Sequence, residues 1–293
     1  MPELPEVEVL ARHLQPLLPG RRIRGVTVRR AKVLRPDSPA GFRRALLGAT
    51  FTGLTRRGKY FLFELRRPGA RAKFTLLGHL GMTGRMYLAR KNSPLPRHAA
   101  VVLHLGRDNF IYEDTRYFGR LTLDLTTVAG LGPEPLSADF APEAFGRALR
   151  RSGQAVKVKL MDQSLVAGIG NLYASEALFR ARISPLRAAN RLTPAQVKRL
   201  WLAIRTVLAE AIECGNTLPL NFGGGAAGGL FYFGRAAGAA DYYTERLCVY
   251  DRAGRPCPQC GRPIRRVVQA ARSTFFCPQC QREAGGERMN YEG

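Results

Sequence analysis

The chain has 293 residues, which is long enough for two domains of ordinary size, each with its own apolar core. Its 46 lysine and arginine residues outnumber 22 aspartate and glutamate residues, and the formal charge of +24 indicates a polyanionic partner. No stretch approaches the roughly 18 apolar residues of a membrane span, and the acidic N-terminus is unlike a signal peptide, so we expect no membrane partner and a cytoplasmic location.

The first predicted element is a helix that begins within Met-Pro-Glu-Leu-Pro-Glu-Val-Glu, where apolar residues recur at helical spacing. Pro5 suits a first turn, and Glu3 and Glu6 complement the positive end of the helix dipole. These facts alone describe an ordinary helix start. A chemical interpretation is also open. If Met1 is removed, Pro2 becomes a free secondary amine, and α-amino groups titrate at about pH 7.7 to 8.0, so part of it is nucleophilic near neutral pH.

Period-two patterns follow this helix and predict eight short strands, at residues 23–30, 50–57, 60–65, 74–80, 85–88, 100–105, 110–113 and 120–125. Turn residues such as Arg57-Gly58 separate them. Short strands at this spacing favour an antiparallel sandwich or barrel over βαβ units. The stretch 130–135, rich in proline and glycine, then predicts a break between domains.

Helical patterns dominate the second half of the chain. We expect helices at 142–151, 156–163, 172–181 and 194–214, the last with Thr193 as its N-cap. The following segment, 221–240, is rich in glycine and alanine around the apolar run 230–233. Its composition fits a disordered linker as well as a binding loop whose aromatic residues order against a ligand.

Two CxxC pairs near the C-terminus have sixteen residues between them and predict a metal site. Cys257, Cys260, Cys277 and Cys280 match the four-cysteine zinc pattern. Four thiolates leave zinc no open position, so the metal would be structural; paired disulfides or a redox CxxC are the alternatives. The two remaining cysteines, Cys214 and Cys248, have no partner at ligand spacing and fit ordinary thiols.

Two short segments offer phosphate-binding chemistry. Gly168-Ile-Gly170-Asn171 places two glycines and an Asn cap at a predicted helix start, where exposed amides favour an anion. Such a motif alone is more often a structural turn, but in a chain this basic it also fits a DNA phosphate. Lys59 sits in a predicted hairpin turn, and only seven of the 46 basic residues are lysine. A site that needs a compact ammonium would keep lysine, whereas the ordinary alternative is a solvated turn residue.

Two glycine-rich turns follow predicted strands and carry large apolar side chains. One holds His79 and Met82, and the other holds Arg116 and Phe118. Packing of the methionine and the phenylalanine into the core is the commoner outcome. Exposed on loops, these side chains would instead supply two apolar wedges and a cation, which enzymes that extrude a base need to fill the vacated stack.

These segments together resemble the Fpg/Nei family of bifunctional DNA-repair glycosylases, and within it the formamidopyrimidine-DNA glycosylase branch. The motifs PELPEVE, RRGKY, HLGMTG, RYFG, GIGNLYASE and RSTFFCPQC carry the resemblance over nearly the whole chain. It implies an α+β multidomain fold, with an N-terminal antiparallel β-sandwich with a leading helix (1–128), a linker (129–152), a helical helix-two-turn-helix domain (153–245) and a zinc-finger β-hairpin (246–284). A lesion-recognition loop would occupy about 216–242.

The resemblance also implies a chemistry for five residues. Pro2 would attack C1′ of the damaged nucleotide and displace the base, and strand cleavage by β- and δ-elimination would follow. Glu3 would act as general acid and base at the sugar, and Glu6 would support the site, for instance by helping to cap the flipped base. Lys59 and Arg272 would grip phosphates and assist elimination.

The remaining site residues are implied as DNA contacts. Asn171 would clamp the phosphate near the lesion, and the other residues that face DNA would be His79, Met82, His98, Arg116, Phe118 and Arg151. Within this set, Met82, Arg116 and Phe118 match the family's void-filling triad and favour oxidised purines, namely formamidopyrimidines and 8-oxoguanine opposite cytosine. The implied protein is a monomer with one structural zinc ion that binds damaged double-stranded DNA and joins the nucleoid through it.

One segment departs from the family pattern. Residues 219–222, Pro-Leu-Asn-Phe, replace the usual basic and acidic pair at the start of the lesion-recognition loop, which leaves the preference between formamidopyrimidine and 8-oxoguanine open. Two other functions remain as alternatives: a Nei-like glycosylase for oxidised pyrimidines, and a non-catalytic zinc-ribbon protein that binds nucleic acid.

Overall fold

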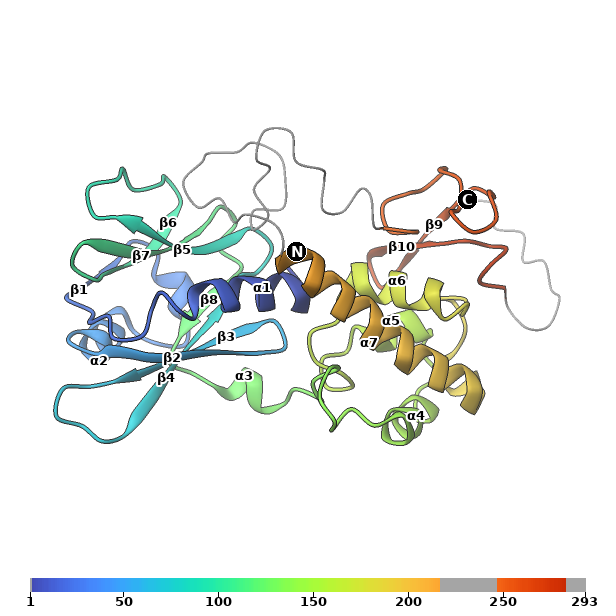
Figure 1. Ribbon diagram of the computed structural model, residues 1–293, viewed down its shortest axis with the longest axis horizontal. Coiled ribbons are helices and arrows are strands. Elements are labelled where there is room, and N and C mark those ends of the chain that lie inside the picture. The colour runs from blue at the N-terminus through green and yellow to red at the C-terminus, as the bar shows by residue number, and fades with distance from the viewer. Residues whose placement is uncertain (1, 217–246, 283–293) are drawn as a thin grey trace. The chain divides into compact units, whose positions relative to one another are not determined.

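The computed structural model describes residues 2–216 and 247–282, and it divides into two compact units (Figure 1). The first contains the described residues up to Leu131 together with the chain from Ala211 to the end of the long helix α7. The second contains Gly132–Glu210 and the described C-terminal segment. The predicted lesion-recognition loop lies outside the described residues, apart from its first position. No helix among the described residues is long and apolar enough to cross a membrane.

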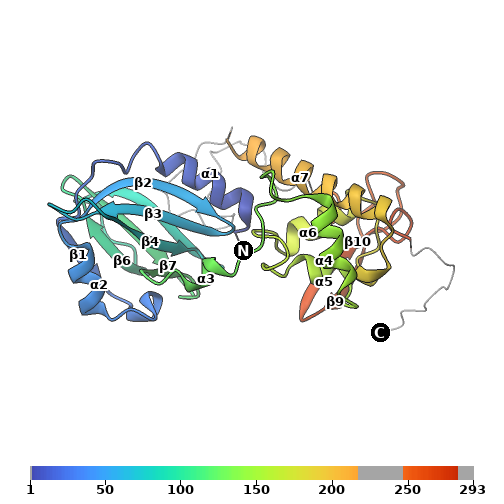
Figure 2. The same ribbon diagram turned by 90° about the horizontal axis from the view of Figure 1, so that it is seen from below.

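The first unit is the predicted antiparallel β-sandwich with a leading helix. Helix α1 (Leu4–Leu14) precedes two four-stranded sheets, one of which contains β2 and β3 and the other β6 and β7 (Figure 2). The strand orders are β2-β3-β4-β8 and β1-β6-β7-β5. The strands are β1 (Gly25–Val28), β2 (Thr50–Arg57), β3 (Tyr60–Arg66), β4 (Lys73–His79), β5 (Gly84–Arg90), β6 (Ala99–His104), β7 (Asp108–Asp114) and β8 (Arg120–Thr122).

Aromatic rings join the two sheets of this unit. The ring of Phe110 on β7 lies 5.4 Å from that of Phe63 on β3 and 6.3 Å from that of Phe51 on β2. All three side chains are buried, as inward-facing positions of period-two strands should be. The predicted alternation therefore produced a sandwich core, and every strand pair in it is antiparallel.

Two details of this unit differ from the sequence prediction. Strand β8 ends at Thr122 because the carboxylate of Asp37 accepts hydrogen bonds from the Thr122 hydroxyl (2.8 Å) and the Leu123 amide (2.6 Å), which removes the next backbone donor from the ladder. The pattern also missed helix α2 (Pro39–Leu46), although Ser38 caps it by accepting from the Gly41 amide. Two short helical turns, η1 (Ala31–Leu34) and α3 (Thr126–Ala129), complete the unit.

The second unit is helical and ends in a two-stranded hairpin. Its helices are α4 (Pro142–Arg150), α5 (Val156–Leu160), α6 (Asn171–Arg180), the short turn η2 (Ala189–Arg191) and the first part of α7 (Pro194–Asn216). Strands β9 (Arg265–Gln269) and β10 (Arg272–Phe276) form the hairpin. Thr193 caps α7 as predicted, since its hydroxyl accepts from the Gln196 amide while the Gln196 side chain accepts from the Thr193 amide.

The hairpin region is fixed to helix α6 by one carboxylate. Glu176 accepts three backbone amides, from Cys248 (2.9 Å), Val249 (2.9 Å) and Tyr250 (2.8 Å). Burial raises the pKa of the Glu176 carboxyl, against the effect of these three hydrogen bonds. Apolar contacts that include Phe179 extend the junction. Residues of the zinc hairpin and of α6 therefore keep a fixed relation within this unit.

Candidate active site and nucleic-acid interface

The N-terminus of helix α1 holds the proposed nucleophile and its carboxylate neighbours. Pro2 is buried, and Glu3 is the N-cap of the helix. The Glu3 amide donates to Glu6 Oε2 at 2.7 Å, while the Glu3 side chain accepts from the Glu6 amide, which forms a reciprocal capping box. Glu3 is 3 % exposed and Glu6 is 1 % exposed. The helix thus fixes the first residues of the chain through their own backbone and side chains.

Helix α1 is tied to the turn that carries Lys59. Arg56 donates from Nε to Glu8 Oε2 at 2.6 Å and from Nη1 to the Gly58 carbonyl at 3.0 Å. Burial would raise the pKa of Glu8, but the hydrogen bonds and charges of Arg56 and Arg12 outweigh it and hold that pKa below its usual value. Lys59 itself is buried, so it is not a solvated turn lysine. Its ammonium is held on the same scaffold as Pro2 and Glu3.

His79 lies at the end of β4, opposite Tyr60, with the two rings 4.7 Å apart. Burial first, and then the charges of Lys59 and Arg120, lower the pKa of His79 to about 4, although the charge of Asp114 opposes them. The ring is therefore neutral at physiological pH. Its Nδ1 accepts the Gly81 amide at 3.2 Å, which leaves the proton on Nε2. His79 can thus donate a hydrogen bond to a phosphate without carrying charge.

The predicted wedge residues are exposed on two neighbouring loops of the first unit. Met82 is 43 % exposed and Phe118 is 48 % exposed, which excludes packing of either side chain into the core. The guanidinium of Arg116 lies over the Phe118 ring, 4.8 Å from its centroid. Large exposed apolar side chains beside a cation are typical of a binding surface. His98 is half-buried nearby, with its ring 6.4 Å from that of Tyr117.

The predicted phosphate clamp joins helices α5 and α6 to the hairpin. Asn171 donates from Nδ2 to the Ser273 carbonyl at 2.9 Å. It is the first residue of α6 rather than its cap, and the prediction of an Asn cap is wrong because Gly170 takes the extended cap position. Ser273 directly follows Arg272, the exposed residue that begins β10. The hairpin therefore brings Arg272 to the start of α6.

Sequence reasoning missed Lys157 on α5. This lysine is 0 % exposed, and its Nζ donates to Asn171 Oδ1 and contacts the Ser273 carbonyl at 3.5 Å. A signal was available, because Lys157 is one of only seven lysines, the same argument that singled out Lys59. Arg151 stands apart from this group: it is exposed at the end of α4, and within the described residues its side chain makes no hydrogen bond to the clamp.

The four cysteines of the CxxC pairs form one cluster. Their sulfur atoms lie within 4.8 Å of one another, with 3.9 Å from Cys257 Sγ to Cys280 Sγ and 3.5 Å from Cys260 Sγ to Cys277 Sγ. Zn–S bonds of about 2.3 Å in a tetrahedron place sulfurs about 3.8 Å apart, so the cluster fits a single structural zinc ion. Each of these two short sulfur–sulfur distances joins a cysteine of the first CxxC pair to a cysteine of the second, so both pairs face one common position.

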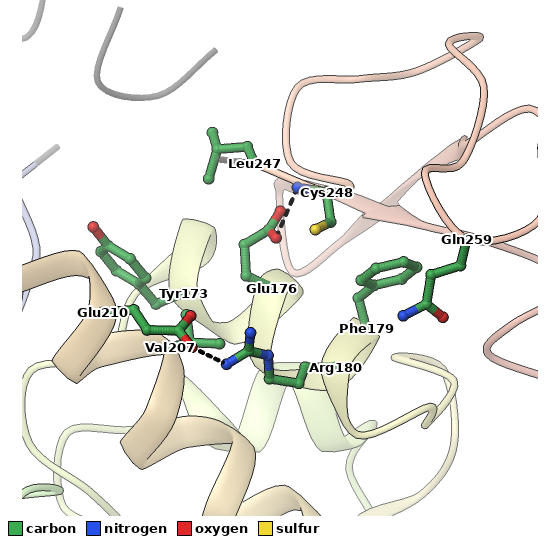
Figure 3. Close-up of a pocket in the computed structure, with 9 residues that line it drawn as sticks. All are labelled: Tyr173, Glu176, Phe179, Arg180, Val207, Glu210, Leu247, Cys248 and Gln259. Carbon is green, nitrogen blue, oxygen red and sulfur yellow. Dashed lines mark hydrogen bonds and ion pairs between the residues drawn. The ribbon is translucent and has the colours of Figure 1, made fainter. Parts of the chain in front are cut away.

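A pocket of about 190 Å³ lies elsewhere in the second unit, between α6, α7 and the segment that enters the hairpin (Figure 3). The Glu176 carboxylate faces it and accepts the Cys248 amide, and Arg180 pairs with Glu210 at 2.7 Å across its rim. Its charged side chains are thus already paired, and none of the predicted site residues lines it. We assign this pocket no part in the chemistry.

Three family models match successive parts of the chain. They are described as the formamidopyrimidine-DNA glycosylase N-terminal domain (residues 1–121), the formamidopyrimidine-DNA glycosylase H2TH domain (131–219) and the zinc finger found in FPG and IleRS (254–282). The matched segments follow the two sheets, the helices and the cysteine hairpin in order.

Named relatives and solved structures agree with these models. The formamidopyrimidine-DNA glycosylase of Symbiobacterium thermophilum is 45 % identical over 96 % of this chain and 89 % of its own, and that of Thermus thermophilus is 41 % identical over 97 % and 99 %. A Lactococcus lactis Fpg complex with DNA that contains N7-benzyl-Fapy-dG has a TM-score of 0.83 at 32 % identity, over 96 % of this chain and all of that one. A complex of the same protein with abasic-site DNA has a TM-score of 0.82 at 31 % identity, with the same coverage. This chain belongs to the formamidopyrimidine-DNA glycosylase family.

Proposed function

We propose that this protein is a bifunctional DNA glycosylase of base excision repair, which removes oxidised purines and then cleaves the strand at the abasic site. The observation that carries the proposal is the buried capping box at the start of α1, which fixes Glu3 beside Pro2. A relative that shares this architecture, the Lactococcus lactis Fpg, was solved on DNA with an abasic site and with Fapy-dG. We propose that the partner is damaged duplex DNA, that a single copy of the chain binds it, and that this binding takes place on the nucleoid.

The chemistry follows from a free secondary amine at Pro2. Once Met1 is removed, the nitrogen lone pair attacks C1′, the bond from C1′ to the base breaks, and the base leaves with the proton that the Pro2 nitrogen releases. Glu3 then protonates the ring oxygen O4′, and the sugar opens to an iminium at C1′. Because the nitrogen is secondary, this cation cannot lose an N–H proton to become a neutral imine. It therefore remains an electron sink for the next step.

Strand cleavage uses that electron sink. Loss of a proton from C2′ sends its electron pair towards the iminium, and the 3′ phosphate leaves; a second elimination releases the 5′ phosphate. Both departures need phosphates held by hydrogen-bond donors. We propose Lys59 and neutral His79 for this task in the first unit, and Asn171 and Arg272 in the second. Lys157, which donates to Asn171, orients the clamp.

We revise the role of Glu6. Glu6 is 1 % exposed, and its Oε2 accepts the Glu3 amide. We therefore propose that Glu6 fixes the position of Glu3 and does not cap the extruded base. For the substrate class, the exposed triad Met82, Arg116 and Phe118 supports a purine lesion paired with cytosine. A guanidinium offers only donors, and cytosine offers two acceptors on its pairing edge.

Borohydride trapping on duplex DNA tests the nucleophile. We expect a covalent complex with DNA that contains 8-oxoguanine opposite cytosine or an abasic site. A variant in which an inserted residue keeps Pro2 internal should bind the same DNA and form no complex, while Pro2→Gly, which keeps an amine, should retain some cross-linking. Native protein that binds such DNA without nicking or cross-linking it would instead be a zinc-ribbon binding protein.

Substrate choice needs a second comparison. Excision of 8-oxoguanine opposite cytosine, of formamidopyrimidine and of thymine glycol should be measured at one salt concentration, because salt alone changes DNA affinity steeply. We expect the two purine lesions to be removed faster. Preferential removal of thymine glycol would place the specificity with the Nei branch.

A further inference from the structure

The carboxylate of Asp114, at the end of β7, accepts four hydrogen bonds although the residue is 0 % exposed. Its Oδ1 accepts the Thr83 hydroxyl at 2.6 Å and the Arg116 amide at 3.1 Å. Its Oδ2 accepts the Gly119 amide at 2.9 Å and the Tyr112 hydroxyl at 3.3 Å. Burial of an ionised carboxylate is costly unless its lone pairs are satisfied, and here both oxygens have two donors.

Three of these donors adjoin the exposed triad. Thr83 follows Met82 in the chain, the Arg116 amide belongs to the triad itself, and Gly119 follows Phe118. The Asp114 amide also donates to the His98 carbonyl at 3.1 Å. The Asp114 carboxylate, which is outside the proposed DNA contacts, therefore accepts one hydrogen bond at or next to each member of the triad: the Thr83 hydroxyl and the Arg116 and Gly119 amides.

The two loops also touch through their backbones. Gly81 has a φ of +61°, and a Cβ added there would lie 2.5 Å from the Gly119 amide nitrogen. A Cβ on Gly119 would collide with the Tyr112 hydroxyl and the His79 carbonyl. The backbones of the two loops are therefore in direct contact at these glycines, where no side chain fits. The exposed triad is held as one body, with Asp114 at its centre.

We propose that Asp114 is a positioning residue that sets the register of Arg116 against the base opposite the lesion, and so determines how strongly the enzyme prefers cytosine there. This inference rests on the proposed function. A guanidinium with two donors in fixed positions discriminates cytosine, whose pairing edge carries two neighbouring acceptors (O2 and N3), from adenine, whose pairing edge carries one (N1). Such discrimination depends on the angle as well as the length of the hydrogen bonds from Arg116 to the base. A loop whose backbone is less rigidly held therefore still attracts DNA but selects less strongly between cytosine and adenine.

A matched pair at Thr83 tests the proposal with little change in volume. Thr83→Ser keeps the hydroxyl that Asp114 accepts, and Thr83→Val removes it. The readout is the ratio of single-turnover excision rates for 8-oxoguanine opposite cytosine and opposite adenine. We expect the ratio to fall about fivefold in Thr83→Val and to stay near the native value in Thr83→Ser, as loss of one hydrogen bond implies.

Asp114→Asn extends the series, because an amide nitrogen cannot accept the two donors that Oδ2 holds. We expect a fall of about tenfold or more in the same ratio, consistent with loss of hydrogen bonds to a charged group. Cleavage of a preformed abasic site, where no base needs extrusion, should change much less than excision in both Asp114→Asn and Thr83→Val. Unfolding temperatures measured alongside report any global loss of structure.

Two results would overturn the proposal. An unchanged cytosine-to-adenine ratio in Thr83→Val would show that the Asp114 network does not set selectivity. A parallel fall in excision opposite both bases and in abasic-site cleavage would show a purely structural role, and the Thr83 pair decides this even if Asp114→Asn fails to fold. If the native protein excises no lesion, the proposed function itself is contradicted, because the cytosine-to-adenine ratio of excision rates cannot then be measured.

Discussion

Lys157 on α5 donates from Nζ to the side-chain oxygen of Asn171 on α6, and no part of this lysine is exposed. Asn171 in turn donates to the Ser273 carbonyl of the hairpin, so one buried lysine fixes the side chain of Asn171, our proposed phosphate clamp, where two segments distant in sequence meet.

We predict that Lys157→Met weakens binding of abasic-site DNA about tenfold, the effect of losing a hydrogen bond to a charged group, because Asn171 then loses the donor that fixes its amide. The unfolding temperature should stay the same or rise, since an apolar side chain of similar length replaces a buried charge. Fluorescence anisotropy and thermal denaturation measure the two effects.

Lys159→Met is the matched control for this prediction. Lys159 lies on the same helix, is partly exposed and pairs with Asp162 at 2.7 Å. Its loss should weaken binding less than loss of Lys157. Equal affinities for Lys157→Met and the native protein would refute an orienting role.

Two substitutions should separate the two glutamates at the start of α1. Glu6→Ala removes one half of the capping box and should cost about 1 kcal/mol of stability, the usual effect of losing an N-cap partner. Glu3→Gln keeps the shape of the cap but cannot exchange a proton, so base excision should fall by about 10²- to 10⁴-fold while DNA binding persists. Denaturant titration and single-turnover kinetics test both. Full activity in Glu3→Gln would remove Glu3 from the mechanism.

The pKa of His79 predicts a pH-dependent stability. This pKa is lowered to about 4 in the folded protein, mainly by burial, against about 6.5 for an unperturbed histidine. Between these values the unfolded chain binds the extra proton, so the contribution of His79 is complete above about pH 6.5 and is lost as the pH falls towards 4. His79→Gln keeps a neutral donor that does not titrate, and should flatten the stability curve in this window. If the stability of His79→Gln depends on pH as steeply as that of the native protein, a group other than His79 is responsible for the pH dependence.

Zinc removal should weaken DNA binding through the hairpin. Cys260→Ser should lose the metal and reduce affinity for abasic-site DNA by about tenfold or more, because Arg272 then loses the fold that carries it. Cys248→Ser is the control: burial, and then the Glu176 carboxylate, raise the pKa of that thiol to about 11, so it stays protonated. Metal content and affinity measure the outcome. Native affinity after proven zinc loss would rule out a hairpin that faces DNA.

Local pattern predicted much of this protein from sequence because the relevant forces act over a few residues. Alternation of apolar side chains located all eight strands of the sandwich, although β8 stops early where Asp37 intervenes from 85 residues away. The paired CxxC spacing identified the zinc ligands, since each pair needs only one tight turn. Helix α2 was not predicted, although its Ser38 cap and Pro39 are typical of a helix start and are visible in the sequence.

The sequence by itself determined which reactive groups are present: a proline at position 2, two acidic residues beside it, a rare lysine in a turn and four cysteines at zinc-ligand spacing. Tertiary structure alone decided which groups act together. Thr83 meets Asp114 across 31 residues, and Lys157 reaches Ser273 across 116. Burial also decided the state of His79, whose neutral ring no sequence pattern shows. Such contacts depend on how sheets and helices pack, and packing brings together residues that no local periodicity relates.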